Sequence, residues 1–176
     1  MPRLFTGLEI DSLVVAEFAA LRGGLPKARW VEPADYHLTL RFIGDVGRDF
    51  ANDIAQGLAD IRAAAAIVAF TDLYCFGGAR PRALVARAAA APALAALQDA
   101  HESLMRRLGL PAQTRKFTPH VTLAQLRGAG PGDLAPWLGA HPLPAMSFIA
   151  ARFALFSARP LIGGGPYRRE ASFALA

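Results

Sequence analysis

Apolar residues recur along the chain with the spacings of short strands and amphipathic helices. Residues 4–10 form an apolar run typical of a strand, and residues 11–21 then place Val14 and Phe18 on one face of a helix that a Gly-Gly pair ends. The same patterns predict further strands over residues 28–31, 36–43, 67–74, 83–86, 119–126, 146–156 and 167–175, and further helices over residues 50–61, 92–108 and 133–138.

The last two expected strands are predicted to form a closing hairpin. Gly163-Gly164-Gly165-Pro166 lies between them and has the composition of a turn. No helix pattern follows these glycines, so we interpret them as a hairpin loop and not as a phosphate-binding loop.

Two of the expected strands contain the same short motif. His37-Leu38-Thr39-Leu40 in one strand matches His120-Val121-Thr122-Leu123 in another. The copies are separated by nearly half the length of the chain, which is the spacing expected for two lobes related by a pseudo-twofold axis. No linker stands between them. Residues 1–176 are therefore predicted to form a single domain made of two pseudo-symmetric lobes.

The motif places an imidazole and a hydroxyl side by side. In a strand, residues i and i+2 project from the same face, about 6.6 Å apart along the chain. Two such strands paired across a pseudo-twofold axis would surround one small anion with the imidazoles of His37 and His120 and the hydroxyls of Thr39 and Thr122. Only six threonines are present, yet two of the four histidines have one two places on, so chance is a poor explanation.

Opening a cyclic phosphodiester needs this set of groups. One base must take a proton from water, one acid must give a proton to the leaving alkoxide, and neutral donors must hold the non-bridging oxygens. Because imidazole titrates near neutrality, one imidazole can be neutral while the other is protonated. The residues by themselves do not assign which histidine is the acid.

Two other interpretations of the motif stay open. A single His-Leu-Thr-Leu strand is commonly ordinary sheet with a hydrogen-bonded histidine at its edge, and histidine is also the commonest ligand of zinc. The motif lacks the i, i+4 spacing of helical zinc ligands, and no third ligand stands nearby in the sequence. We therefore expect neither a metal ion nor another cofactor.

Composition and charge narrow the class of protein further. Hydrophobic residues make up 53% of the chain and charged residues 19%, which favours a folded core over disorder. The net charge of +5 and the pI of about 10.1 favour polyanionic partners such as RNA, although a GC-rich genome would also enrich arginine. Cys75 is the only cysteine, which excludes an intramolecular disulfide and a cysteine-based metal cluster.

The sequence shows no signal for a membrane or for export. No apolar run has the length of a membrane span, and the N-terminus leads straight into the first expected strand without the apolar region of a signal peptide. We expect a cytoplasmic monomer, and no protein partner is evident.

The chain resembles the RNA 2′,3′-cyclic phosphodiesterase family (2′–5′ RNA ligase-like) of the two-histidine phosphoesterase superfamily. The resemblance covers nearly the whole length and is carried by residues 3–10, 29–33, 37–44, 80–84 and 117–124, which include both motifs. It implies an α+β, bilobal, pseudo-twofold fold in which two antiparallel sheets line a central cleft and helices lie outside.

The resemblance also implies an activity and the roles of the site residues. The implied reaction is metal-independent hydrolysis of RNA 2′,3′-cyclic phosphate ends to 2′-phosphomonoesters, with RNA 3′ ends or small cyclic nucleotides as partners. His37 would be the general acid toward the leaving 3′-oxygen, and His120 would be the general base on water. Thr39 and Thr122 would bind phosphate oxygens.

One position departs from the family pattern. An arginine usually follows the second threonine by three residues, where this chain has Gln125, so a fixed cation at the phosphate is missing. Arg41, two residues beyond Thr39, and Arg127, just past the second strand, are candidates to replace it. Arg41 is equally well interpreted as a solvated strand-end residue. A residue three beyond Thr122 faces the site only if the strand bends or ends there.

A few other residues and functions complete the interpretation. Phe5 and Phe117 are the aromatic residues favoured for stacking a nucleobase. His101 is expected to pack within a helix, and His141 is expected to lie exposed in a loop.

Two competing functions stay open. One is a nucleotide- or RNA-end-binding module with weak turnover, favoured by Gln125. The other is 2′–5′ RNA ligation or hydrolysis of another cyclic nucleotide phosphate.

Overall fold

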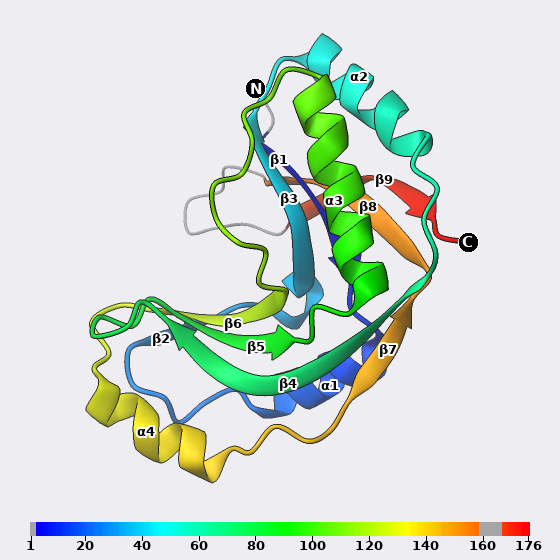
Figure 1. Ribbon diagram of the computed structural model, residues 1–176. Coiled ribbons are helices and arrows are strands. Elements are labelled where there is room, and N and C mark those ends of the chain that lie inside the picture. Colours follow the sequence, from blue (N-terminus) through cyan, green and yellow to red (C-terminus); the bar gives the residue numbers. More distant parts are fainter. Residues whose placement is uncertain (1–2, 159–166) are drawn as a thin grey trace.

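Four α-helices and nine strands are present among the residues that the computed structural model describes, 3–158 and 167–176 (Figure 1). The strands are β1 (Arg3–Glu9), β2 (Ala28–Trp30), β3 (His37–Asp45), β4 (Ala66–Phe76), β5 (Ala83–Ala88), β6 (His120–Leu126), β7 (Ser147–Ala150), β8 (Arg152–Ala158) and β9 (Tyr167–Ala174). The helices are α1 (Ser12–Ala20), α2 (Arg48–Ala59), α3 (Pro92–Arg107) and α4 (Pro131–Ala140), and η1 (Pro33–Asp35) is a 3₁₀ turn. The expected α+β class is confirmed.

The strands form one antiparallel path, β7-β4-β5-β6-β3-β1-β8-β9, and β2 pairs with β6. The two expected sheets are the two halves of this path. They are joined where β3 and β6, the strands that carry the motifs, pair through Leu38 and Val121. The boundary between the lobes therefore runs between the two motifs, and the lobes share one continuous sheet.

The two motif strands have the same burial pattern. Leu38 and Val121 are fully buried, and Leu40 and Leu123 are at most 1% exposed, whereas the histidine and threonine of each motif are only partly buried. α3 packs against β3 and β4 (Figure 1). A one-residue slip of either strand would expose side chains whose burial is worth about 1.5–3 kcal/mol each. The core thus holds the imidazoles on the opposite face.

Both motif strands contain a β-bulge one residue after the threonine. The register of β3 against β1 skips Leu40, and the register of β6 against β5 skips Leu123. Because a bulge adds a residue to its strand, two successive residues turn toward the core, and the next one, Phe42 or Gln125, returns to the exposed face. The bend that Gln125 needs in order to face the site is therefore present.

Gly7 lets β1 approach the first motif strand closely. It pairs with Thr39, and a Cβ atom at this position would lie 2.7 Å from the carbonyl oxygen of Leu38. A side chain larger than hydrogen would therefore push β3 away. Glycine at this position keeps the strand that carries His37 in place.

The strand expected over residues 146–156 is two strands. β7 pairs with β4 and β8 pairs with β1, so the chain crosses from one half of the sheet to the other at Ala151. The apolar residues continue through this crossing although only β8 is largely buried and Ile149 of β7 is exposed, so the sequence shows no break. The pairing of β8 with β9 confirms the closing hairpin, while residues 163–166 lie outside the described part of the chain.

Among residues 3–158 and 167–176, no helix is both long and apolar enough to cross a membrane.

Candidate active site

The histidines and threonines of the two motifs lie together on the face of β3 and β6 that points away from the core. Because the middle residues of the motifs are paired in antiparallel strands, one step along each strand brings His37 opposite Thr122 and Thr39 opposite His120. Facing residues in such a pair have Cβ atoms about 4.5–5.5 Å apart. The imidazoles therefore occupy one diagonal of a small quadrilateral and the hydroxyls the other.

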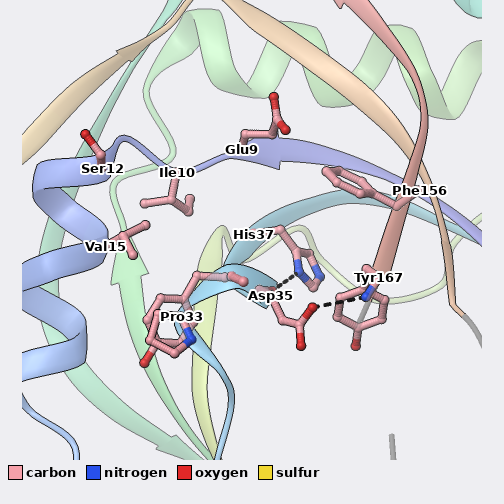
Figure 2. Close-up of a pocket in the computed structure, with 11 residues that line it drawn as sticks. Glu9, Ile10, Ser12, Val15, Pro33, Asp35, His37, Phe156 and Tyr167 are labelled. Carbon is pink, nitrogen blue, oxygen red and sulfur yellow. Dashed lines mark hydrogen bonds between the residues drawn. The ribbon is translucent and has the colours of Figure 1, made fainter. Parts of the chain in front are cut away.

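The two imidazoles are held in the same way. Nδ1 of His37 lies 2.7 Å from the carbonyl oxygen of Asp35, and Nδ1 of His120 lies 2.7 Å from the carbonyl oxygen of Thr118; Figure 2 shows the first of these contacts. A carbonyl oxygen only accepts, so Nδ1 carries the hydrogen in both rings. Nε2 of each ring is then the nitrogen that accepts or donates the transferred proton.

Aromatic side chains pack around His37 (Figure 2). Its ring centroid lies 4.7 Å from that of Phe5 and 4.7 Å from that of Tyr167, which meets it edge-on. Phe5 is only 3% exposed and stacks on Phe156. The expectation that Phe5 stacks a nucleobase is therefore wrong, because its ring is buried between His37 and Phe156. The backbone N–H of Tyr167 donates to the Asp35 carboxylate at 3.0 Å and ties β9 to this side of the site.

Burial lowers the pKa of His37 below its ordinary value. The Nδ1 hydrogen bond to Asp35 opposes this effect, and the nearby charge of His120 adds to it. His37 is therefore neutral at pH 7 in the free protein. An anion bound at Nε2 would raise its pKa and allow it to take up a proton.

His120 borders a cavity on its side of the motifs. The cavity has a volume of about 660 Å³, and Thr39 and His120 open into it. Phe76 meets the His120 ring edge-on, with ring centroids 4.9 Å apart. The cavity is also lined by three cationic side chains and one further aromatic ring: Arg82, Arg115, Lys116 and Phe117. Phe117, which the sequence favoured for stacking a nucleobase, thus lines the same cavity as Thr39 and His120. We call this cavity the basic pocket.

The side of His37 is different in shape and charge. A cavity of about 330 Å³ drawn in Figure 2 is lined by the carboxylates of Glu9 and Asp35. A further cavity of about 250 Å³ is lined by Arg29, Glu32 and Asp35, together with Gln125 and Tyr167. Both are smaller than the basic pocket and carry more acid. The four motif groups are therefore arranged with pseudo-twofold symmetry, but the charges around them are not symmetric: cations lie on the His120 side and carboxylates on the His37 side.

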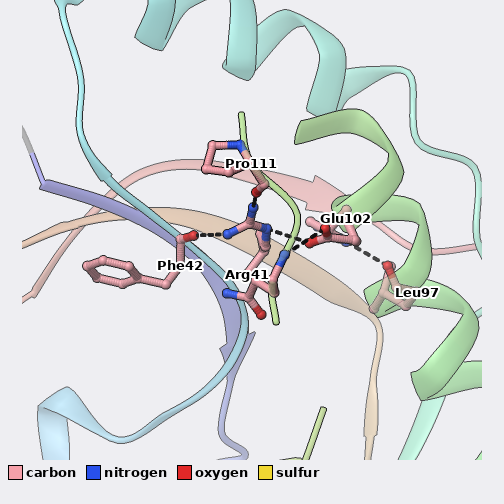
Figure 3. Close-up of polar contacts among 7 residues, drawn as sticks. Arg41, Phe42, Leu97, Glu102 and Pro111 are labelled. Carbon is pink, nitrogen blue, oxygen red and sulfur yellow. Dashed lines mark hydrogen bonds and ion pairs between the residues drawn. The ribbon is translucent and has the colours of Figure 1, made fainter. Parts of the chain in front are cut away.

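Arg41 does not lie at the site. Its guanidinium pairs with the Glu102 carboxylate at 2.6 Å and donates to the carbonyl oxygen of Pro111 at 2.6 Å (Figure 3). The side chain is 7% exposed, so the interpretation as a solvated strand-end residue is also wrong. The bulge at Leu40 is the reason, because it turns Arg41 toward α3 and away from the face that carries Thr39.

Gln125 does face the site and stands beside an arginine that the sequence did not single out. It pairs across β6 and β2 with Arg29, and both line the same cavity. In the described part of the chain no carboxylate lies within ion-pair distance of Arg29, since neighbouring Glu32 is taken by Arg22 at 2.8 Å. Arg127 follows the end of β6 and is exposed. The pairing of β2 with β6 was not predictable from periodicity, so no local signal pointed to Arg29.

The remaining histidines and the cysteine lie away from the site. His101 is fully buried in α3, with Nδ1 2.8 Å from the carbonyl oxygen of Leu97, and burial lowers its pKa to about 4. It is a packed helix histidine, as expected. His141 stacks on Trp137 and is only partly exposed. Burial raises the pKa of the Cys75 thiol, which keeps it inert near neutral pH. Within the described ranges, no cluster of three His, Cys, Asp or Glu side chains is arranged to hold a metal ion.

A solved phosphoesterase structure has the same fold. Escherichia coli LigT in complex with 3′-AMP superposes with a TM-score of 0.79 at 22% sequence identity, covering 100% of this chain and 99% of that one. The two proteins therefore share their fold.

The family model described as LigT like Phosphoesterase matches the chain twice, over residues 8–86 and over residues 85–164. The chain therefore belongs to the LigT-like phosphoesterase family. The first match contains the motif of His37 and the second contains the motif of His120, so each matched segment carries one copy.

Two curated relatives have the same name, RNA 2′,3′-cyclic phosphodiesterase. The one from Aeropyrum pernix is 35% identical over 108 residues, which are 60% of this chain and 61% of the relative. The one from Bacillus subtilis is 29% identical over 141 residues, which are 73% of this chain and 70% of the relative.

Proposed function

We propose that this protein hydrolyses the 2′,3′-cyclic phosphate at RNA ends, with His37 and His120 as its acid–base pair and without a metal ion. The observation that carries the proposal is the pair of imidazoles that are anchored through Nδ1 and present Nε2 across one diagonal of the site. The names of the two curated relatives support the substrate class. The nucleotide bound in the structure of the E. coli protein supports a nucleotide-sized ligand.

The reaction follows from the diagonal arrangement. Nε2 of His120 takes a proton from water, and the water oxygen attacks phosphorus in line with the bond to the 3′-oxygen. That bond breaks, and protonated His37 gives its proton to the leaving 3′-oxygen, so the product is a 2′-phosphomonoester. The hydroxyls of Thr39 and Thr122 donate to the non-bridging oxygens on the other diagonal. His120 ends protonated and His37 neutral, and exchange with solvent restores the starting state.

The free and bound states of His37 differ in charge. Burial keeps the imidazole neutral in the free protein, whereas the negative phosphodiester favours its protonated form. Substrate binding would therefore raise the pKa of His37 and cause its imidazole to take up a proton from solvent. This coupling fits the role of His37 as the acid, since the proton is present only when there is a leaving group to receive it.

Arg29 is the cation best placed to compensate for Gln125. The two residues pair across β2 and β6 and share a cavity next to Tyr167, which packs against His37. The Gln125 amide donates a neutral hydrogen bond, while the guanidinium of Arg29 offsets the charge that develops on phosphate. Arg29 would thus supply the cation that the family pattern has at the position of Gln125 and that this chain lacks there.

The test uses a short RNA with a 2′,3′-cyclic phosphate end and resolves the products as 2′- or 3′-phosphates by ³¹P NMR. His37→Ala and His120→Ala should each lower kcat by about 10²–10⁴-fold, the double variant should lose far less than the product of the two, and a chelator should change nothing. His141→Ala is the matched control. Near wild-type rates in either variant, or activity that returns only with a divalent metal, would contradict the mechanism. A 3′-phosphate product would show that the leaving group is the 2′-oxygen.

A binding module with weak turnover is the second candidate, and Gln125 is the observation that favours it. With protein in excess over RNA, an enzyme converts all of the cyclic ends at a rate close to its kcat. A binding module leaves the cyclic ends intact over the same time. The proposal further takes the protein to be a cytoplasmic monomer, which sedimentation and cell fractionation test.

A further inference from the structure

Asp35 contacts the surroundings of His37 through two different groups (Figure 2). Its backbone carbonyl oxygen lies 2.7 Å from Nδ1 of His37, and its carboxylate accepts the backbone N–H of Tyr167 at 3.0 Å. Tyr167 begins β9 and follows Asp35 by 132 positions in the chain. One residue thus joins the turn before the first motif strand to the strand at the end of the sheet.

The position of Asp35 is fixed locally. It is the last residue of η1, where its N–H donates to the carbonyl oxygen of Glu32 at 2.8 Å and Pro33 restricts the backbone at the start of the turn. The next side chain, Tyr36, is 5% exposed and meets the ring of Phe18 edge-on. Because the turn is held from both sides, the carbonyl oxygen and the carboxylate of Asp35 have little freedom to move.

The carboxylate of Asp35 holds an aromatic ring against the imidazole. Tyr167 meets the His37 ring edge-on with 4.7 Å between ring centroids, and it meets Phe5 edge-on at 4.9 Å. Tyr167 is 39% exposed and lines the two cavities that flank His37, so packing encloses its ring only in part. The hydrogen bond to Asp35 therefore adds to the pairing of β9 with β8 in keeping this ring beside the imidazole.

Asp35 also differs from the other acidic residues around His37 in its charged neighbours. Those residues form ion pairs with arginines: Glu9 with Arg169 at 2.7 Å, and Glu32 with Arg22 at 2.8 Å. Among residues 3–158 and 167–176, no cation lies within ion-pair distance of the Asp35 carboxylate. Arg29 lines a cavity together with Asp35, and on the β6 side the titratable group that faces His37 is the imidazole of His120. The negative charge of Asp35 is therefore not cancelled by a contacting cation.

The anchors of the two histidines differ in this charge. Thr118 holds the His120 ring through its carbonyl oxygen as Asp35 holds the His37 ring, but the side chain of Thr118 is a neutral hydroxyl. Burial lowers the pKa of His37, while the hydrogen bond and the charge of Asp35 raise it again, against the charge of His120. The acid, which must carry a proton, thus has a carboxylate in its anchor, and the base does not.

We propose that Asp35 is a positioning residue for proton transfer by His37: its carbonyl oxygen orients the imidazole, its carboxylate holds Tyr167 beside the ring, and its negative charge favours a proton there. The inference rests on the function proposed above, in which His37 is the acid, and it adds a residue that lies outside both motifs. Asp35 acts through His37 and Tyr167 and is assigned no contact with the phosphate.

Two substitutions separate the charge of Asp35 from its hydrogen bond. Asn keeps an oxygen that accepts the Tyr167 N–H but is neutral, whereas Ala removes both functions; the backbone carbonyl oxygen remains in each variant. In NMR spectra of the free protein, Asp35→Asn should move the titration of the His37 ring to lower pH, because the protonated form loses a favourable charge. It should leave the hydrogen exchange of the Tyr167 amide unchanged. Asp35→Ala should speed that exchange by about 3–10-fold, as expected for one lost hydrogen bond.

Kinetics on a short RNA with a cyclic-phosphate end show whether this positioning serves the reaction. Because kcat falls as pH rises through the pKa of the acid, Asp35→Asn should move that limb of the pH profile to lower pH. Asp35→Ala should lower kcat by at least about 10-fold and change KM by less than about 3-fold, since a misplaced acid weakens the transition state and not substrate binding.

Variants of Tyr167 test the link between the carboxylate and the ring. Tyr167→Ala should lower kcat as Asp35→Ala does, whereas Tyr167→Phe keeps the ring and should keep the rate. The double variant Asp35→Ala/Tyr167→Ala should be no more than about 3-fold slower than Asp35→Ala, because both substitutions remove the same contact. A loss in Tyr167→Ala that falls on KM and not on kcat would overturn the inference, because Tyr167 would then contact the substrate directly.

Asp45→Asn is the matched control, since Asp45 lies at the opposite end of β3 in an exposed ion pair with Arg3. It should change neither the titration of His37 nor the rate. The inference is overturned if Asp35→Asn leaves the His37 titration in place or if Asp35→Ala keeps the wild-type kcat. Asp35→Asn retains the size of the side chain and keeps the inference testable should Asp35→Ala not fold. The NMR measurements need no substrate: the expected shifts together with a silent His37→Ala would contradict the proposed function, and not the part of Asp35 in holding the ring.

Discussion

At the scale of single residues, the site depends on how each imidazole is anchored. The carbonyl oxygens of Asp35 and Thr118 each lie two residues before their histidine and receive its Nδ1 hydrogen. The anchor is thus local to each motif and is repeated by the pseudo-twofold arrangement. The differences between the two histidines come from their surroundings: aromatic rings and acids around His37, and cations around His120.

An arginine at position 29 or at position 125 could supply the positive charge that stabilises the phosphate, because the two positions are paired across β2 and β6. If Arg29 supplies it, Arg29→Gln should lower kcat/KM by about 10–100-fold, the worth of a charge-assisted hydrogen bond of about 1.5–3 kcal/mol. Adding Gln125→Arg to that variant should restore much of the loss, because the two positions are paired across β2 and β6. Gln125→Arg alone should give a smaller gain, since two arginines would then face each other.

Steady-state kinetics of the two single variants and the double variant measure this as a double-mutant cycle. Arg29→Lys is the control that keeps the charge without the guanidinium fork. A silent Arg29→Gln, or a loss that Gln125→Arg does not repair, would place the cation elsewhere.

His101 makes stability depend on pH. Its folded pKa of about 4 lies below the ordinary value of 6.5, so the unfolded chain binds a proton first as pH falls. The stability that the neutral ring contributes at pH 7 is lost as pH falls from 6.5 through 4. The free energy of unfolding should drop by about 2 kcal/mol more in wild type than in His101→Gln between pH 7 and pH 5. Urea unfolding of both proteins at the two pH values measures this, and parallel falls would contradict it.

At the scale of elements, a bulge in each motif strand decides which side chains serve the site. The bulge at Leu123 brings Gln125 onto the site face, and the bulge at Leu40 sends Arg41 into the contact with α3. A bulge at the same place in each strand thus turns Gln125 toward the site in β6 and turns Arg41 away from it in β3. Arg41 instead connects β3, α3 and the segment after α3.

Arg41 is therefore expected to act on stability and not on the phosphate directly. Arg41→Ala leaves the largely buried Glu102 carboxylate without its partner and should lower the free energy of unfolding by about 3–5 kcal/mol. Arg3→Ala is the control: it removes an arginine from an exposed ion pair with Asp45 and should cost less than about 1 kcal/mol. Chemical denaturation measures both. A loss for Arg41→Ala no larger than for Arg3→Ala would contradict the structural role.

At the scale of the whole molecule, the two lobes do not correspond to two independent halves of the sequence. The half of the sheet built from β3 and β1 also contains β8 and β9, and the half built from β4 and β5 contains β6 and β7. The first of these halves therefore combines strands from the two ends of the chain, whereas the second is built from strands in the middle of it. The family model matches two consecutive segments, but the hydrophobic core is shared between them.

Residues 1–89 expressed alone should consequently not fold. That fragment contains β1 to β5 but lacks α3, β6 and β8, which cover or pair with β3, β4, β5 and β1. Its urea titration should show no cooperative transition, whereas the full chain should show one. A fragment with a cooperative transition and native-like chemical-shift dispersion would mean that the lobes are separable domains.

The sequence by itself determined the elements and the chemistry of the site. Periodicities of two and of about 3.6 are properties of strands and helices, so the apolar patterns located nearly every element. The spacing i, i+2 puts His and Thr on one face of any strand, and the near-identity of the two motifs indicated a shared anion site. These inferences need only neighbours in the chain.

The tertiary structure alone decided which other residues join that site. A strand reverses its faces at every residue, so one bulge reassigns everything beyond it, and the bulges at Leu40 and Leu123 depend on pairing with β1 and β5. Arg29 meets Gln125 only because β2 pairs with β6. The basic pocket exists only because the segment after α3, which carries Arg115 and Lys116, and the β4–β5 hairpin, which carries Arg82, come together beside His120. Such contacts join residues far apart along the chain, and no local pattern encodes them.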